Sequence, residues 1–91
     1  MEKKTYIFHE DAGHGWLAVP MNYLIALGIA NKITGCSYLK GNTAYLEEDC
    51  DMQQFLLAFR EKFGKFPAFI QKYKENSHVR YYPRYSYEEV A

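Results

Sequence analysis

Apolar side chains recur at intervals of three and four residues over positions 52–63, the clearest periodicity in the chain. This spacing places them on one side of an α-helix. Asp49 or Asp51 can cap that helix, since Gln54 follows Asp51 at capping-box spacing, and Gly64 ends it. Because such a helix must bury its apolar side, the rest of the chain has to supply another layer. The residues of the stripe are Met52, Phe55, Leu56, Phe59 and Phe63.

Two segments near the N-terminus, residues 4–9 and 14–19, are rich in strand-forming residues. The residues between them have turn chemistry and include a glycine, so the pair predicts a β-hairpin. With a three-residue loop at 11–13, Phe8 lies opposite Trp16. We expect both faces of this hairpin to carry apolar residues.

Residues 33–39 and 43–47 predict a second hairpin, with a Gly-Asn dipeptide as its two-residue turn. This register sets Tyr38 opposite Tyr45, so that the two rings pack as a cross-strand pair. Both hairpins are short enough to join into one antiparallel sheet.

Three further elements complete the expected order ββαββααβ. A helix begins at Pro20 and stops near Gly28. A short helix begins at Pro67, and residues 78–82 form a last strand. We therefore expect one small α+β domain over residues 1–91, in which two or three helices cover an antiparallel sheet, with a frayed tail at 86–91.

The composition is that of an ordinary globular protein, with 48 % hydrophobic and 24 % charged residues. The formal net charge is zero, which excludes a histone-like polycation and a wholly acidic DNA mimic. No apolar run approaches the ~20 residues that span a bilayer, and the N-terminus lacks the apolar core of a signal peptide. We expect a soluble cytoplasmic protein with no membrane partner, whose two cysteines, Cys36 and Cys50, are free and mostly buried thiols.

His9 and His14 flank two carboxylates in a His-Glu-Asp-x-x-His pattern that resembles a metal-binding sequence. The three-residue loop directs the two imidazoles to opposite faces of the hairpin, whereas a shift of one residue would reverse this. Cys36 and Cys50 are separated by 13 residues, which fits no zinc knuckle. We therefore predict no metal ligands and no cofactor.

Cys50 lies at the start of the periodic helix, where the helix dipole lowers a thiol pKa. Four carboxylates surround it in the sequence and oppose a thiolate. We predict a protein that is not an enzyme. One alternative, which ranks behind the two binding functions described below, is a small metal- or thiol-dependent enzyme built on His9, Asp11, His14 or Cys50.

The same four carboxylates form an acidic cluster, Glu47, Glu48, Asp49 and Asp51. One interpretation is that they stabilise the N-terminus of the helix through its dipole. The other is an acidic patch for a basic partner, or a weak divalent-cation site. Glu47, Glu48 and Asp49 are the candidate binding residues of this second patch.

The C-terminal third is basic and rich in tyrosine. Residues 60–84 hold seven Lys or Arg against two Glu. Guanidinium groups alternate with rings near its end, a combination that contacts phosphates and stacks on bases, and that also anchors protein interfaces. A solvated helix face beside a strand packed on the core is the structural interpretation. The candidate binding residues are Arg80, Tyr81, Tyr82, Arg84 and Tyr85.

Three segments together resemble a family of small proteins encoded by phages, plasmids and other mobile elements of bacteria. The resemblance implies context rather than catalytic residues: such proteins often bind and inhibit host defence machinery or regulate transfer. The segments are His-Glu-Asp-Ala-Gly-His-Gly-Trp-Leu-Ala-Val-Pro at 9–20, Leu-Gly-Ile-Ala-Asn-Lys-Ile at 27–33 and Ala-Tyr-Leu-Glu-Glu-Asp-Cys-Asp at 44–51.

The sequence thus predicts a non-enzymatic accessory protein that occludes a surface of a host or mobile-element protein. The alternative is a nucleic-acid or small-nucleotide binding module that uses the basic, tyrosine-rich third. A free edge strand would also permit a homodimer.

Overall fold

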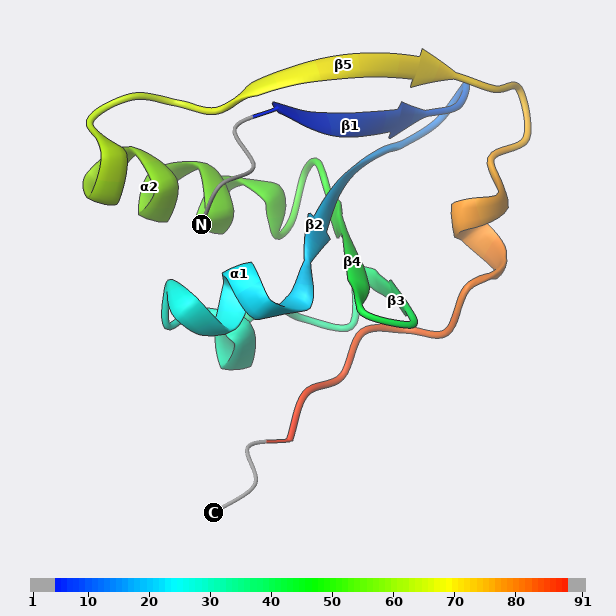
Figure 1. The fold of residues 1–91 in the computed structure, drawn as a ribbon. Helices are drawn as coiled ribbons and strands as arrows, with labels where there is room; N and C mark the ends of the chain where they lie inside the picture. Colours follow the sequence, from blue (N-terminus) through cyan, green and yellow to red (C-terminus); the bar gives the residue numbers. More distant parts are fainter. Residues whose placement is uncertain (1–4, 89–91) are drawn as a thin grey trace.

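Five strands form one mixed sheet in the order β3-β4-β2-β1-β5 in the computed structural model, which describes residues 5–88 (Figure 1). Every pair of neighbours is antiparallel except β1 and β5, which are parallel. An α+β domain is therefore confirmed, although its sheet is not wholly antiparallel. The strands are β1 (Thr5–Glu10), β2 (Gly15–Pro20), β3 (Tyr38–Lys40), β4 (Thr43–Glu47) and β5 (Ala68–Tyr73).

The first hairpin is confirmed, but its loop has four residues, 11–14, and the register is shifted by one. His9 lies opposite Trp16, and Phe8 lies opposite Leu17. The loop is longer than predicted because Asp11 shapes it. Its carboxylate accepts hydrogen bonds from the backbone N–H groups of Gly13 and His14, at 3.0 and 2.9 Å.

One face of the sheet is covered by α1 (Met21–Ala26) and α2 (Met52–Phe63), as Figure 1 shows. The predicted stripe on α2 is confirmed, with Phe55 and Phe59 buried and Phe63 at its exposed end. Tyr6 of β1 packs edge-to-face on Phe55, with ring centroids 5.1 Å apart. Gly64 ends α2 in the left-handed region at a φ of 78°.

The second hairpin is confirmed together with its Tyr38–Tyr45 pair. Its first strand begins at Tyr38 rather than at residue 33, because side-chain hydrogen bonds of Thr34 and Ser37 to Asp51 hold the loop at 34–37 against the start of α2 and outside the β3–β4 ladder. The helix predicted from Pro20 ends at Ala26, and a short 3-10 helix, η1 (Ala30–Lys32), follows it.

Two predicted elements near the C-terminus are wrong. Residues 68–73 form β5 rather than a helix, and residues 78–81 form a 3-10 helix, η2 (His78–Tyr81), rather than a strand. The apolar residues at 69, 70 and 73 fit a helical spacing locally. Pairing with all six residues of β1 satisfies the backbone groups on one side of the segment and makes it a strand instead.

Residues 77–85, termed here the C-terminal segment, cross the other face of the sheet and then follow its β3 edge (Figure 1). Leu39 N–H donates to Pro83 O, and Tyr85 N–H donates to Ser37 O, each at 2.8 Å. Tyr87, within the tail predicted to fray, packs against the core. The remainder of that predicted tail, 89–91, lies outside the described residues, as does Lys4 of the first predicted strand.

Asp51 occupies the N-cap position of α2, but its side chain does not cap the helix. Its buried carboxylate instead accepts hydrogen bonds from Thr34 N–H, Thr34 Oγ1 and Ser37 Oγ, at 3.1, 3.0 and 2.5 Å. Ser37 Oγ in turn accepts from Glu47 N–H at 3.0 Å. Asp51 therefore fastens the loop before β3 to the start of α2.

We expect Asp51→Ala to lower the free energy of unfolding by roughly 2–4 kcal/mol, because it leaves several buried donors without an acceptor. Chemical denaturation measures this change. Asp49→Ala removes an exposed neighbouring carboxylate and serves as the control. Equal loss of stability in the two variants would contradict the role assigned to Asp51.

Candidate functional site

Aromatic side chains gather on the face of the sheet opposite the helices. Trp16 lies against Tyr38 with ring centroids 6.2 Å apart, and Tyr45 lies 5.1 Å from Tyr82 of the C-terminal segment. His9 extends this row, with its ring 5.6 Å from that of Tyr45. We call these five residues the aromatic row.

Three cations rest on the rings of this row. The guanidinium carbon of Arg80 lies 5.4 Å from the centre of the Trp16 ring, and that of Arg84 lies 4.8 Å from Tyr38. Lys40 Nζ lies 4.7 Å from the centre of the Tyr82 ring. These cation–π contacts hold the C-terminal segment on the sheet.

Arg80 also forms an ion pair with Asp11. Its Nη2 donates to Oδ1 at 2.9 Å, and its Nε donates to Oδ2. The Arg80 hydrogen bond is the largest cause of an Asp11 pKa that lies well below its ordinary value, and the two backbone hydrogen bonds lower it further. Burial of the carboxylate acts in the opposite direction but is outweighed. The pair joins the loop of the first hairpin to η2.

A lowered carboxylate pKa in the folded protein contributes stability above the ordinary value of 3.8, and this contribution is lost as the pH falls below it. We therefore expect wild-type protein to lose more unfolding free energy than Asp11→Asn between about pH 5 and about pH 2. Denaturation at each pH measures the difference. Glu61→Gln, on the exposed side of α2, is the control and should show the same dependence of unfolding free energy on pH as wild type. If Asp11→Asn also shows the wild-type dependence, Asp11 is not its cause.

The structure separates the five C-terminal residues predicted to bind a partner. Tyr81 is free, at 80 % exposure, and Tyr82 is half-buried in the aromatic row. Arg80 and Arg84 keep exposed atoms but are engaged within the chain, since Arg84 Nη1 also donates to Gly35 O at 3.1 Å. They therefore do not form one open surface.

Tyr85 is a correction to that prediction, because it is a core residue at 5 % exposure. Its hydroxyl donates to Ala30 O at 2.5 Å, and burial raises its pKa to about 12. The ring is drawn inward because the C-terminal segment turns around the β3 edge and reaches the face covered by the helices.

The predicted acidic patch is also divided. Glu47 is buried: its Oε1 lies 3.3 Å from His14 Nδ1, and its Oε2 accepts from Asp49 N–H at 2.6 Å. Glu48 and Asp49 remain at the surface. The pKa of Glu48 is raised by partial desolvation and by Asp49. Glu47 therefore orients the loop rather than presenting charge to a partner.

A pocket of about 510 Å³ lies beside Arg80 and contains both cysteines. They are free, as expected, but exposed rather than buried. The loops that carry them turn Ser37 and Asp51 inward, which directs the neighbouring thiols outward. The residues lining this pocket are His14, Trp16, Cys36, Tyr38, Glu47, Asp49, Cys50, Arg80 and Arg84.

The Cys50 thiol is held in its protonated form. A hydrogen bond with the Cys36 thiol is the largest cause of its raised pKa, while a hydrogen bond with Thr34, whose Oγ1 lies 3.7 Å from Cys50 Sγ, acts in the opposite direction. Because the thiolate is the nucleophile, this arrangement makes Cys50 less reactive at neutral pH.

We expect Cys36→Ala to speed alkylation of Cys50 at pH 7, because the variant removes the hydrogen bond that raises the pKa of Cys50. Peptide mass spectrometry after timed alkylation gives the rate at Cys50 alone. Cys36→Ser replaces the thiol with a hydroxyl, which can donate to the Cys50 thiolate as Thr34 does, and it should also label faster than wild type. Identical rates for Cys36→Ala and wild type would show that Cys36 has no such effect.

The two histidines considered as metal ligands lie in different pockets. His14 lines the pocket that holds the cysteines, whereas His9 lines one bounded by β5 and the C-terminal segment. Over residues 5–88, no group of three or more His, Cys, Asp or Glu is placed to hold a metal ion.

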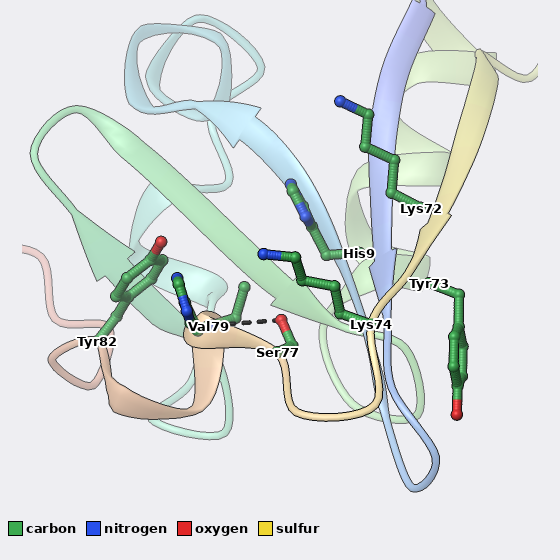
Figure 2. A pocket seen from close by; sticks show the side chains of 8 residues that line it. His9, Lys72, Tyr73, Lys74, Ser77, Val79 and Tyr82 are labelled. Atoms are coloured by element: carbon green, nitrogen blue, oxygen red, sulfur yellow. Dashed lines mark hydrogen bonds between the residues drawn. The ribbon is translucent and has the colours of Figure 1, made fainter.

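The pocket at His9 is basic, a feature that the sequence did not reveal (Figure 2). His9 comes from β1, whereas Lys72, Lys74 and His78 lie close together in the chain, in β5, just after it and in the C-terminal segment. The local signals were the excess of cations in residues 60–84 and the spacing of Lys72 and Lys74, which directs two residues to the same side of an extended chain.

Exposed apolar side chains are concentrated at and just before β5, another feature that sequence reasoning missed. Of the eight large hydrophobic residues exposed in the described chain, five lie between positions 63 and 73. They are Phe63, Phe66, Phe69, Ile70 and Tyr73.

No helix within residues 5–88 has the length and apolar character needed to cross a membrane. Comparison with protein-family models, with curated proteins and with solved structures found no match for this chain.

Proposed function

We propose that this is a non-enzymatic binding protein that accepts an extended segment of another protein as an additional strand on the free edge of β5. One observation carries the proposal: β5 is an edge strand of six residues, all of them exposed. Such a strand offers a row of backbone donors and acceptors that a second chain can complete.

One edge of the sheet is covered by another part of the chain, and the other edge is open. The C-terminal segment covers the β3 edge with an isolated bridge between Tyr38 and Arg84, which consists of two backbone hydrogen bonds. β5 pairs with β1 on its inner side, and the described residues place no strand on its outer side. An uncovered edge of this length is a feature that proteins ordinarily avoid unless it binds something.

Apolar side chains on both faces of β5 would extend the contact beyond the backbone. Phe69 lies on the face covered by the helices, where its ring centroid is 5.8 Å from that of Phe8, and it is 43 % exposed. Ile70 is directed to the opposite face and is 57 % exposed. Apolar residues on either face of an added strand would pack against them.

The charge around β5 indicates the chemistry of the partner. Residues 60–74 carry five Lys or Arg and one Glu. A second copy of this chain would bring the same positive excess to the edge, which opposes a homodimer through β5. An extended segment that alternates apolar and acidic residues complements this edge in both shape and charge.

The resemblance to mobile-element proteins supplies the biological side of the proposal. An accessory factor of that kind would occupy a host protein by capturing one of its exposed extended segments. Binding of this type needs no catalytic group, which agrees with the engaged arginines and the protonated thiol described above.

The test is a selection of random linear peptides against the wild-type protein, with Ile70→Asp as the counter-target. We expect enriched peptides to alternate apolar and acidic residues, and to bind wild type at least about tenfold more tightly than Ile70→Asp, because an added carboxylate repels them. Amide hydrogen exchange at 68–73 should slow when the peptide binds.

Ile25→Asp is the matched control, since Ile25 is 50 % exposed on α1, away from β5. Peptides that bind Ile70→Asp and wild type equally would overturn the proposal, as would a basic consensus. A doubled mass in sedimentation that Ile70→Asp abolishes would identify the occupant of this edge as a second copy instead.

A further inference from the structure

We infer that the pocket between β1, β5 and the C-terminal segment binds the phosphate group of a small phosphate monoester, of the size of a nucleoside monophosphate. This inference is independent of the strand-binding edge. It rests on four basic residues, His9, Lys72, Lys74 and His78, that line one pocket without a carboxylate among the lining residues.

The pocket has a volume of about 470 Å³, within the range of small-molecule sites. His9 and Lys72 are register partners on adjacent strands, so their side chains are directed to the same face of the sheet. Figure 2 shows Lys74 extending toward the side occupied by His9, whereas Tyr73 points away from it. The lining residues are His9, Lys72, Tyr73, Lys74, Ser77, His78, Val79 and Tyr82.

The basic side chains of this pocket form no ion pair within the described chain. The ion pairs found over residues 5–88 join His14 to Glu47 and Arg80 to Asp11, and neither involves a residue of this pocket. Lys40 adds a further cation beside it, above the Tyr82 ring. The arginines are thus bound internally, while these lysines remain available to an anion.

The pKa of the His9 imidazole is lowered both by burial and by the neighbouring cation. Burial is the main cause of its lowered pKa, and the positive charge of Lys72 lowers it further. The other groups around it are Lys74 and His78, together with the rings of Tyr45 and Tyr82. An anion placed among them would offset the part of this lowering that the charge of Lys72 causes.

The remaining lining groups suit a phosphate ester better than a bare anion. Ser77 Oγ accepts a hydrogen bond from Val79 N–H at 3.3 Å, which leaves its O–H free to donate. Val79 and Tyr82 supply apolar surface on the same side. The volume exceeds what a phosphate alone requires, so an attached organic group fits against this wall.

The test is an NMR titration with inorganic phosphate, adenosine 5′-monophosphate and adenosine, following the imidazole signals of His9 and His78. We expect both phosphates to shift these signals and to raise the pKa of His9, while adenosine leaves them unchanged. The monophosphate should bind more tightly than inorganic phosphate because its organic group fills the pocket.

The double variant Lys72→Gln/Lys74→Gln should weaken monophosphate binding by at least about tenfold. Lys62→Gln/Lys65→Gln removes the same charge outside the pocket and should bind like wild type. Equal weakening by the two variants would show that net charge alone causes the effect and would overturn the site. Binding of adenosine as tight as that of its monophosphate would overturn it too. If a single-stranded oligonucleotide without a terminal phosphate binds more tightly than the monophosphate, the ligand of this pocket is a nucleic-acid backbone and the proposed monoester is wrong.

Discussion

The parallel pairing of β5 with β1 is the contact on which the other features depend. α2 carries the chain from β4 across two strands to the far edge of the sheet, where β5 pairs along all six residues of β1. This places β1 inside the sheet and leaves β5 as its open edge. The same pairing sets Lys72 beside His9, so one strand supplies both the edge proposed to bind protein and a wall of the basic pocket.

A second constraint is the C-terminal segment, which Arg80 anchors to Asp11 and to the Trp16 ring. This anchoring explains why the arginine-rich end is poorly suited to be the main interface: its guanidinium groups already have partners. Lys72 of β5 and Lys74 just after it, in contrast, have none among the ion pairs of the described chain. Charge that is neutralised within the fold stabilises it, and charge left without a partner is available to a ligand.

Local patterns predicted much of the fold. The stripe from Met52 to Phe63 and its stop at Gly64 are set by helical periodicity and by a left-handed glycine. The second hairpin follows from its turn residues. The prediction failed at residues 68–73, whose apolar spacing fits a short helix, because only β1 could select a strand there. The candidate site was predicted at residue 80 onward, but Tyr85 is buried by a turn around the β3 edge.

The sequence by itself determined that the chain forms an α+β domain, since its periodicities and turns are local properties. It also placed an excess of cations in the C-terminal third. Only the tertiary structure decided which of these cations are neutralised and which are left unpaired. That outcome depends on which strands become neighbours and which side chains Asp11 and the aromatic row engage, and both are contacts between residues far apart in the chain.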